Sequence, residues 1–412
     1  MCDLSKCKPV TPEDTLKYIL GLDLKDWELK STFIGDDDEK VTHFILSYNG
    51  TRPICPICGK GMVIHDYKER VWRHANLNKA ICYIHAKVPR YRCPDCGGIH
   101  QVEVPWADPN VSYSKTFMEV AIEHLAHMSL AATSRLLRCS WTMLDDIVGR
   151  VVHDHLDNLD LSGVTRIRVD ETSAKRRHRY ITVVTDVDTG KIVFITKGKD
   201  SKTMEEFACW LSAHGGNPKD IVLMASDFGD SFVKGAREHL PNARNVYDPF
   251  HLVQLGNQKL DKDRSKEQVN GQRLKSIRYA LLKNTENLSE EESDLVTDIS
   301  KDNSVTSLSY QMNMSLRESL ELDDPDLARM YLGMWVDWVD REGSKNFKAL
   351  SKTVRKYMDG IILALSSGVN NGYQESLNGR IQFSKRLANG YHKEERLVRM
   401  VFFRDSLRGH PS

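Results

Sequence analysis

An alternation of strand-like and helix-like stretches between residues 164 and 250 constrains the fold of this chain more than any other feature. Three short stretches rich in β-branched residues come first, and the turn Asp188-Thr189-Gly190 joins the second to the third: 165–169, 180–187 and 191–196. Four further elements follow in order: an amphipathic helix at 203–214, a wholly apolar run at 221–225, a helix capped by Asp230 or Ser231, and a strand at 242–247. The sequence therefore predicts a β-β-β-α-β-α-β unit of the α/β class.

This order of elements resembles that of the ribonuclease-H-like fold, in which the first and fourth strands lie side by side. An acid follows each of these two strands, Asp170 after 165–169 and Asp227 after 221–225. Two carboxylates at adjacent strand ends repel each other unless a divalent cation lies between them, and such oxygen ligands suit Mg²⁺ or Mn²⁺. Two such ions about 4 Å apart can activate a water or a 3′-hydroxyl in phosphodiester cleavage. The alternative is that both aspartates only cap turns.

A third acid that could complete such a site, Glu375, lies far downstream. Its segment predicts the start of a helix with Asn370 or Asn371 as the N-cap. On spacing alone, an acid in a first helical turn is usually explained by its interaction with the helix dipole. Between Asp227 and Glu375 lie 147 residues, far more than the core needs. The sequence therefore predicts an insertion, which has a helical pattern from about residue 265 to 350.

Two Cys-x-x-Cys-Gly turns, separated by 34 residues, predict a closed structural zinc site with four thiolate ligands: Cys55, Cys58, Cys93 and Cys96. Alternating stretches between the two turns are typical of the strands of a zinc ribbon. The alternative is a pair of unligated thiol turns or a redox pair. Six basic residues around the ribbon predict a surface that contacts the DNA backbone, with an ordinary solvated face as the alternative: Arg52, Lys60, Arg70, Arg73, Arg90 and Arg92.

A helical pattern from residue 114 to about 152 contains a candidate helix-turn-helix. Residues 129–137 would form its first helix, with Arg135 exposed to DNA, followed by a turn at 138–140 and a second helix at 141–150. An ordinary antiparallel helical hairpin would give the same pattern. The second helix carries Asp145 and Asp146, which do not suit contacts near phosphate.

The charge balance limits how this chain can bind nucleic acid. Lysine and arginine total 58 against 57 acids, a formal net charge of +1, which excludes a uniformly basic coat. Segment 51–100 has nine basic residues and three acids, so DNA binding must depend on local patches. No apolar run approaches the roughly 18–20 residues that cross a bilayer, and the chain starts without an apolar signal segment. We expect a cytoplasmic, nucleoid-associated protein with no membrane contact, whose nine cysteines are thiols or metal ligands.

Asp170, Asp227 and Glu375 in this order, behind a zinc ribbon and a helical hairpin, resemble a bacterial insertion-sequence DDE transposase of the IS-L-three family. The resemblance extends from about residue 50 onward, and its most specific segments are 169–173, 240–251, 371–378 and 388–391. It implies that the three acids are the catalytic ligands of two Mg²⁺ or Mn²⁺ ions per active site. It also implies double-stranded DNA partners, namely terminal inverted repeats and target DNA. Because two ends must be paired, a homodimer is the expected assembly.

The same resemblance bears on two further motifs. Asp248-x-x-His251 is similar to a Cys-or-Asp-x-x-His motif that follows the second acid in related transposases, which makes both residues candidate accessory groups. A helix N-cap with a packed histidine is the alternative. Related transposases also carry an all-α insertion that contacts DNA, where Trp335 and Trp338 could stack on a displaced base. Tryptophans three residues apart are more often ordinary core residues.

The chain is therefore predicted to be a multidomain α/β protein with a zinc ribbon, a helix-turn-helix-like region and a ribonuclease-H-like catalytic domain interrupted by an all-α insertion. Six segments are expected: an N-terminal segment at 1–50, the ribbon at 51–105, the helix-turn-helix region at 110–160, the first part of the core at 161–260, the insertion at 261–360, and the helix of Glu375 with the C-terminus at 361–412. The predicted function is metal-dependent cleavage and strand transfer of DNA at insertion-sequence ends. The alternative is a DNA-binding regulator whose ribonuclease-H-like domain is catalytically unused.

Overall fold

The computed structural model describes residues 26–35, 40–175, 179–198, 200–228, 230–268, 278–283, 285–300, 304–367, 372–388, 390–391 and 393–407, with the single residues 18, 21 and 24. The chain divides into two compact units, residues 1–154 with 406–412 and residues 155–405. Among the helices that the structure describes, none combines the length and the apolar character needed to cross a membrane. Each unit is considered by itself below.

The first unit contains a sheet with the strand order β1-β2-β4-β3, in which β5 also pairs with β4. Its strands are β1 (Trp27–Ile34), β2 (Val41–Tyr48), β3 (Val63–Leu77), β4 (Ala80–Arg92) and β5 (Ile99–Gln101). The long β3–β4 hairpin turns at Asn78 and Lys79, which both have positive φ. Because β2 pairs with β4, the end of the predicted N-terminal segment and the strands of the predicted ribbon share one sheet.

Three helices follow the sheet: α2 (Lys115–His127), α3 (Leu130–Leu137) and α4 (Trp141–Asp157). Serine hydroxyls cap all three N-termini, since Ser114 accepts from Phe117 N, Ser129 from Ala132 N and Ser140 from Met143 N. Helix α3 ends at Arg138, whose left-handed conformation breaks the helix. The predicted helix, turn and helix between residues 129 and 150 are therefore confirmed, and α4 extends seven residues further than predicted.

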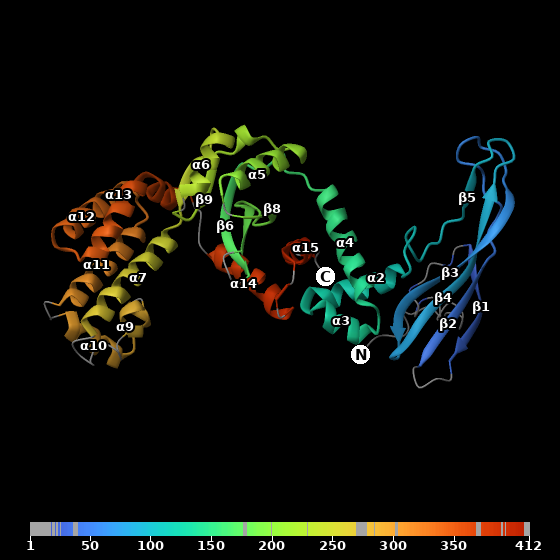
Figure 1. The fold of residues 1–412 in the computed structure, drawn as a ribbon, viewed down its shortest axis with the longest axis horizontal. Helices are drawn as coiled ribbons and strands as arrows, with labels where there is room; N and C mark the ends of the chain where they lie inside the picture. Colours follow the sequence, from blue (N-terminus) through green and yellow to red (C-terminus); the bar gives the residue numbers. More distant parts are fainter. Residues whose placement is uncertain are drawn as a thin grey trace, which may run out of the picture. The chain divides into compact units, whose positions relative to one another are not determined.

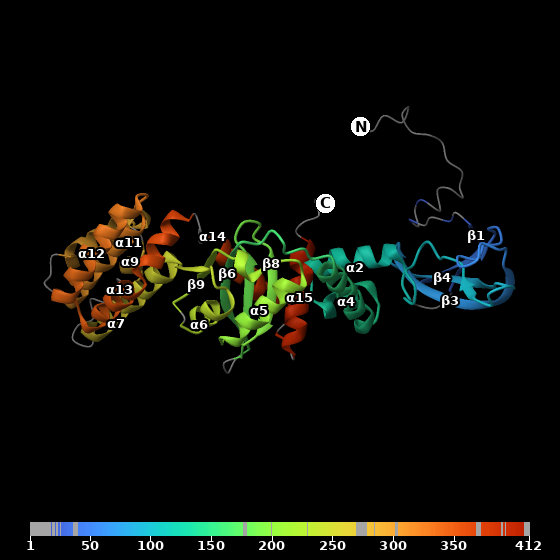
Figure 2. The same ribbon diagram turned by 90° about the horizontal axis from the view of Figure 1, so that it is seen from above.

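The second unit contains a sheet with the strand order β10-β9-β6-β7-β8. Its strands are β6 (Arg166–Lys175), β7 (Arg179–Asp186), β8 (Ile192–Lys197), β9 (Leu223–Ser226) and β10 (Arg244–Tyr247). β6, β9 and β10 run parallel, whereas β6, β7 and β8 form an antiparallel meander. Helices α5 (Lys202–Ala213) and α6 (Asp230–His239) cover one face, and α14 (Gly372–Leu387) and α15 (Glu394–Ser406) lie on the other (Figures 1 and 2). The predicted order of elements is confirmed.

Alternation along β6 assigns its side chains to the two faces of this sheet. Ile167 and Val169 are buried in a core with residues of α5 and α6. Asp170 and Thr172 point to the opposite face, where side chains of α14 contact them. β6 continues to Lys175, six residues beyond the predicted strand end at 169, because β7 pairs with it from Ile167 to Lys175. Asp170 therefore lies within a strand instead of following one.

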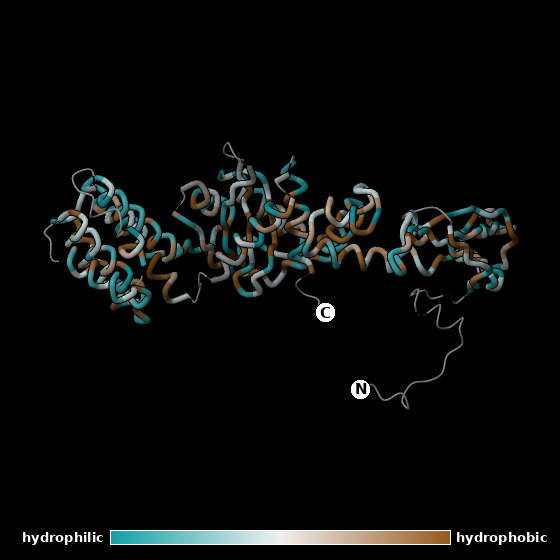
Figure 3. Tube along the Cα trace, turned by 90° about the horizontal axis from the view of Figure 1, so that it is seen from below, coloured by the Kyte–Doolittle hydropathy of each residue, from teal (hydrophilic) through white to brown (hydrophobic). Residues whose placement is uncertain are grey.

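The segment between β10 and α14 is helical wherever the structure describes it, apart from short connections. Its helices are α7 (Pro249–Gln268), α9 (Arg278–Leu282), α10 (Glu290–Ser300), α11 (Val305–Leu320), α12 (Pro325–Glu342) and α13 (Lys345–Ser366). Hydrophobic and hydrophilic stretches alternate along these helices (Figure 3). Their apolar sides share one core, in which Trp335, Phe347 and Leu316 are fully buried. The helical pattern thus extends well beyond the predicted 265–350.

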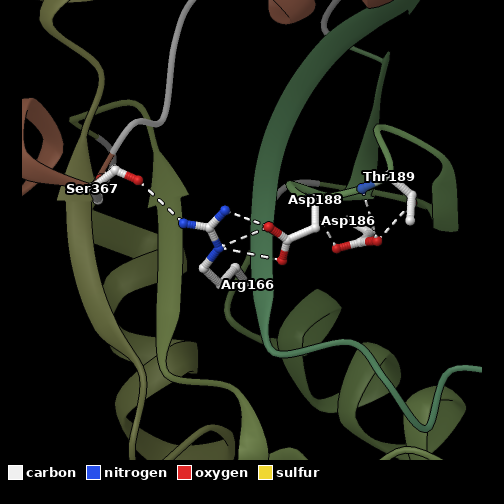
Figure 4. Close-up of polar contacts among 5 residues, drawn as sticks. All are labelled: Arg166, Asp186, Asp188, Thr189 and Ser367. Atoms are coloured by element: carbon white, nitrogen blue, oxygen red, sulfur yellow. Dashed lines mark hydrogen bonds and ion pairs between the residues drawn. The ribbon is translucent and has the colours of Figure 1, made fainter.

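Arg166, the first residue of β6, joins the sheet to the end of α13 (Figure 4). Its Nε lies 3.1 and 3.2 Å from the two carboxylate oxygens of Asp188, and its Nη1 donates to the carbonyl of Ser367 at 3.1 Å. The turn that carries Asp188 is itself braced, since Thr189 donates to Asp186 through its backbone N–H and its hydroxyl. These bonds hold the exit of the helical segment against the core sheet.

Candidate active site and zinc centre

Asp170, within β6, and Asp227, directly after β9, come together across two parallel strands. β6 pairs with β9 up to Arg168 and Ala225, and extending this register by two residues places Asp170 opposite Asp227. Both aspartates line one small pocket, together with Arg168, Val169, Ala225, Ser226, Asp248 and His251. Its volume of about 10 Å³ is close to the space that one water molecule occupies. The paired acids predicted from the strand order therefore meet.

Helix α14 brings an amide to this pocket. Asn378 Nδ2 donates to Asp170 Oδ2 at 3.0 Å, and further along the helix Lys385 Nζ donates to the Ser173 carbonyl at 2.6 Å. Glu375 belongs to the first turn of α14, but its side chain lies outside the described residues. Residues three apart are neighbours on a helix surface, so position 375 and Asn378 share one side of α14. Asn378 had no predicted role, although it belongs to the segment 371–378 that carries part of the family resemblance.

Asp248 is a helix N-cap, the alternative stated for it from the sequence, and its side chain also lies beside His251. Asp248 Oδ1 accepts from Phe250 N at 2.9 Å, which caps α7, and the side chain is 9% exposed. Its other oxygen, Oδ2, lies 3.9 Å from His251 Nδ1, an atom that is buried and has no hydrogen-bond partner among the described residues. An aspartate can do both because its two oxygens are independent acceptors. Both side chains line the pocket of Asp170 and Asp227.

The four predicted zinc ligands lie at one point in the first unit. All four Sγ atoms are within 4.8 Å of one another, with Cys55–Cys96 at 3.6 Å and Cys58–Cys93 at 3.4 Å. Thiolates about 2.3 Å from one tetrahedral zinc would be about 3.8 Å apart, so this donor set fits the ion. The pKa of the Cys93 thiol is lowered to about 6, mainly by a hydrogen bond from the backbone N–H of Cys96. This favours the thiolate form that binds metal.

The two cysteine turns repeat one backbone geometry. Gly59 and Gly97 both have a φ near +70°, and their N–H groups donate to the carbonyls of Cys55 and Cys93. Positive φ at these positions explains why each knuckle ends in glycine. Within the described residues this is the single cluster of three or more Cys, His or acidic side chains with such spacing.

Arg73 is not a DNA contact, and that prediction is wrong. Its side chain is 3% exposed, and it donates to the carbonyls of Leu137 at 2.8 Å and Cys82 at 3.1 Å. Burial lowers the pKa of its guanidinium group. Arg73 therefore ties the β3–β4 hairpin to the end of α3, and it cannot reach phosphate.

The other predicted basic contacts remain accessible to different degrees. Arg70 donates to the Val111 carbonyl at 2.8 Å and stacks over the Trp72 ring, and Arg90 forms an ion pair with Asp66. Arg92 and Arg135 are exposed. These four arginines keep charge at the surface of the first unit.

Trp335 is a core residue, and the prediction that it stacks on a DNA base is wrong. The side chain is 2% exposed, and its Nε1 donates to the Met312 carbonyl at 2.7 Å. Trp338 is half-buried and donates to Glu342 at 3.1 Å. The alternative of an ordinary core position is confirmed for Trp335.

Asp146 in α4 does not present an unpaired negative charge. Its Oδ2 accepts from Tyr113 Oη at 2.7 Å and from Arg150 Nε at 2.8 Å. Burial and this carboxylate raise the pKa of Tyr113, so the phenol stays protonated. One of the two acids that argued against DNA contact by this helix is thus paired within the unit.

Comparison with known proteins agrees with this arrangement along the chain. A family model described as a transposase matches residues 167–401. A model for the zinc-finger of transposase IS204/IS1001/IS1096/IS1165 matches residues 51–96, and one for the helix-turn-helix domain of transposase family ISL3 matches residues 102–155.

Whole proteins are similar over nearly the full length. The transposase for insertion sequence element IS1557 of Mycobacterium tuberculosis is 27% identical, over 96% of this chain and 95% of the relative. The transposase for insertion sequence element IS1001 of Bordetella parapertussis is 23% identical, over 87% of this chain and 90% of the relative. These matches favour the transposase over the DNA-binding regulator. Because the transposase model alone covers more than half of the residues, the chain belongs to transposase family ISL3, the IS-L-three family.

Proposed function

We propose that Asp170, Asp227 and Glu375 together form the metal-binding catalytic site with which this transposase cleaves element ends and joins them to target DNA. The hydrogen bond from Asn378 to Asp170 carries this proposal. It holds the start of α14 at the strand edge where Asp170 and Asp227 lie opposite each other. In the proposed site Glu375, one helical turn before Asn378, belongs to the same edge.

The fold around these acids supports a ribonuclease-H-like assignment. The order β10-β9-β6-β7-β8, with two parallel and two antiparallel pairings between neighbours, places the first and fourth strands of the unit side by side. The helices from α7 to α13 then form an all-α insertion between β10 and α14. In this proposal the insertion runs from α7 to α13, wider than the expected 261–360, and β1 and β2 belong with the ribbon sheet.

The catalytic residues hold and orient the reacting groups. Divalent cations, two per site and Mg²⁺ or Mn²⁺ by the oxygen donors available, would supply Lewis acidity for the attacking and leaving oxygens. Asn378 fixes the orientation of the Asp170 carboxylate through Oδ2. Asp248 is held rigid as the cap of α7 and faces His251, so these two accessory residues shape the pocket wall next to the acids.

The first unit supplies sequence recognition in this proposal. One zinc ion holds the cysteine knuckles, and the helix-turn-helix of α3 and α4 binds the terminal inverted repeats. Arg70, Arg90, Arg92 and Arg135 contact their phosphates. Two ends must be joined in one event, so the active form is a homodimer bound to DNA at the nucleoid.

Substitution of each acid tests the catalytic assignment. Asp170→Ala, Asp227→Ala and Glu375→Ala should each lower cleavage of oligonucleotides carrying the element ends by at least about 100-fold. Binding of the same oligonucleotides should persist. Glu205→Ala is the matched control for Glu375, because Glu205 is also an acid in a first helical turn but lies in α5. Full cleavage by any of the three acid variants would refute the assignment of that residue.

A further inference from the structure

A basic groove lies next to the catalytic pocket and has no part in the function described so far. Its volume is about 900 Å³, and its walls come from α6, β10 and the C-terminal half of α13. All three elements belong to the second unit. The groove is far larger than the pocket that holds Asp170 and Asp227.

The groove carries an excess of positive charge. Four exposed cations line it against two acids, Glu238 and Asp359: Lys234, Arg237, Arg244 and Lys356. Asp359 is already paired with Arg329 at 2.8 Å, outside the groove. With the side chains that the structure describes, Lys234, Arg237 and Arg244 form no ion pair. Like charges held together in this way destabilise the free protein and attract a polyanion.

The floor of the groove is rigid and includes an unsatisfied acceptor. Gly360 of α13 packs directly on β10, since a Cβ there would lie 2.4 Å from the Tyr247 ring. Tyr247 in turn contacts the Tyr357 ring, with centroids 4.5 Å apart. Asn245 Oδ1 is buried without a hydrogen-bond partner among the described atoms, and Asn245 lines the groove. Buried polar atoms are normally satisfied, so this acceptor is an exception in the wall of the groove.

The groove leads toward the catalytic acids. Tyr247 lies in its wall and is followed directly by Asp248 of the catalytic pocket. Phe228, which follows Asp227, stacks on Tyr247 with ring centroids 5.4 Å apart. A polyanion bound along the groove would therefore continue toward the site of chemistry.

We propose that this groove binds the backbone of target DNA, an inference that rests on the proposed function. Contacts from lysine and arginine to phosphate are independent of sequence, which suits DNA that is not recognised by a fixed repeat. Flanking DNA is covalently attached to a bound element end, so its effective concentration is high without contacts of its own. Target DNA is a separate molecule and must be captured by a surface of its own.

Strand transfer with precut ends tests the groove separately from cleavage. Full-length protein is loaded with precut element ends, and a plasmid without element ends serves as the target. In Lys234→Ala/Arg244→Ala the half-saturating target concentration should rise about tenfold, because two phosphate contacts are lost. The rate at saturating target should stay within about twofold, as should cleavage of uncut ends. The slope of log affinity against log salt should become shallower by about 2.

Two further variants separate the groove from charge and folding effects. Lys262→Ala/Arg341→Ala removes two exposed cations from α7 and α12, outside the groove, and should leave target saturation unchanged. Lys234→Arg/Arg244→Lys keeps both charges and should have the half-saturating target concentration of the wild-type protein.

Three results would overturn the proposal. The first is a half-saturating target concentration that does not change in the Lys234→Ala/Arg244→Ala protein. The second is a rise of the same size in the Lys262→Ala/Arg341→Ala protein. The third is a tenfold loss of end cleavage by the Lys234→Ala/Arg244→Ala protein, which would assign the groove to donor DNA. Wild-type protein that neither cleaves nor joins ends would instead refute the proposed function. In that case, the affinity of the same variants for a duplex without element ends would show whether the groove binds DNA.

Discussion

The side-chain amide of Asn378 donates a 3.0 Å hydrogen bond to the Asp170 carboxylate, across 208 residues of sequence. Together with the bond from Lys385 to the Ser173 carbonyl, this contact joins α14 to β6, the first strand of the core sheet. It also leaves Asp170 with a fixed orientation before any metal binds. A carboxylate that is a metal ligand depends on such an outer partner for its geometry.

Removing the Asn378 amide should impair catalysis without impairing end binding. For Asn378→Ala we expect cleavage to fall about 10- to 100-fold, the usual effect of losing an outer-shell partner of a metal ligand. Cleavage by Asn378→Asp should fall further, because an additional carboxylate beside Asp170 repels it. Single-turnover cleavage over a range of Mg²⁺ concentrations measures both. Gln382→Ala, one turn along α14, is the control and should remain near wild type; wild-type cleavage by Asn378→Ala would contradict the orienting role.

Breaking the Arg166 junction should loosen the exit of the helical segment. In Arg166→Ala the fork to Asp188 and the bond to the Ser367 carbonyl are both lost, at an expected cost of about 1–2 kcal/mol in the free energy of unfolding. Arg166→Lys should recover only part of this, since an ammonium group cannot form the bidentate pair. Urea unfolding and protease cleavage near residue 367 provide the measurement. Equal stability of all three proteins would show that the junction has no structural role.

Arg73 and Arg92 should have opposite phenotypes although both belong to the same hairpin. Arg73→Ala leaves the Leu137 and Cys82 carbonyls without a donor and should destabilise the first unit by about 2–3 kcal/mol. Arg92→Ala should leave stability within about 0.5 kcal/mol, because Arg92 is exposed. It should instead weaken DNA binding and lower the salt slope by about 1. Thermal unfolding and binding titrations at several salt concentrations on both variants would expose any reversal of this pattern.

Zinc removal should unfold the ribbon and spare the catalytic unit. Purified protein is expected to contain one zinc per chain by elemental analysis. Chelation should open residues 55–96 to protease and weaken DNA binding, because metal binding supplies the folding free energy of such sites. The sheet of β6 to β10 should keep its protection, since the cysteine site belongs to the other unit. Protein without zinc that remains protected across residues 55–96 would show that the thiols are not a structural site.

Most local features could be predicted from the sequence because local physics determines them. The helix N-caps at Ser114 and Ser129, the glycines after each cysteine pair and the alternation of β6 to β10 all depend on residues a few positions apart. The pairing of Asp170 with Asp227 was also accessible, because parallel strands in a known order bring their carboxyl ends to one edge. The length of β6 could not be predicted from the sequence, since pairing with β7 extends this strand past Asp170.

By itself, then, the sequence determined the order of the elements in the core sheet, the four-cysteine cluster and the family. Only the tertiary structure decided which polar side chains are buried and which meet. Arg73 and Arg92 occur in similar alternating stretches, yet packing against α3 buries the first and leaves the second exposed. Trp335 and Trp338 lie in the same helix, but only Trp335 is fully buried in the core of the helical segment. Burial and long-range hydrogen bonds depend on the path of the whole chain, which no local pattern contains.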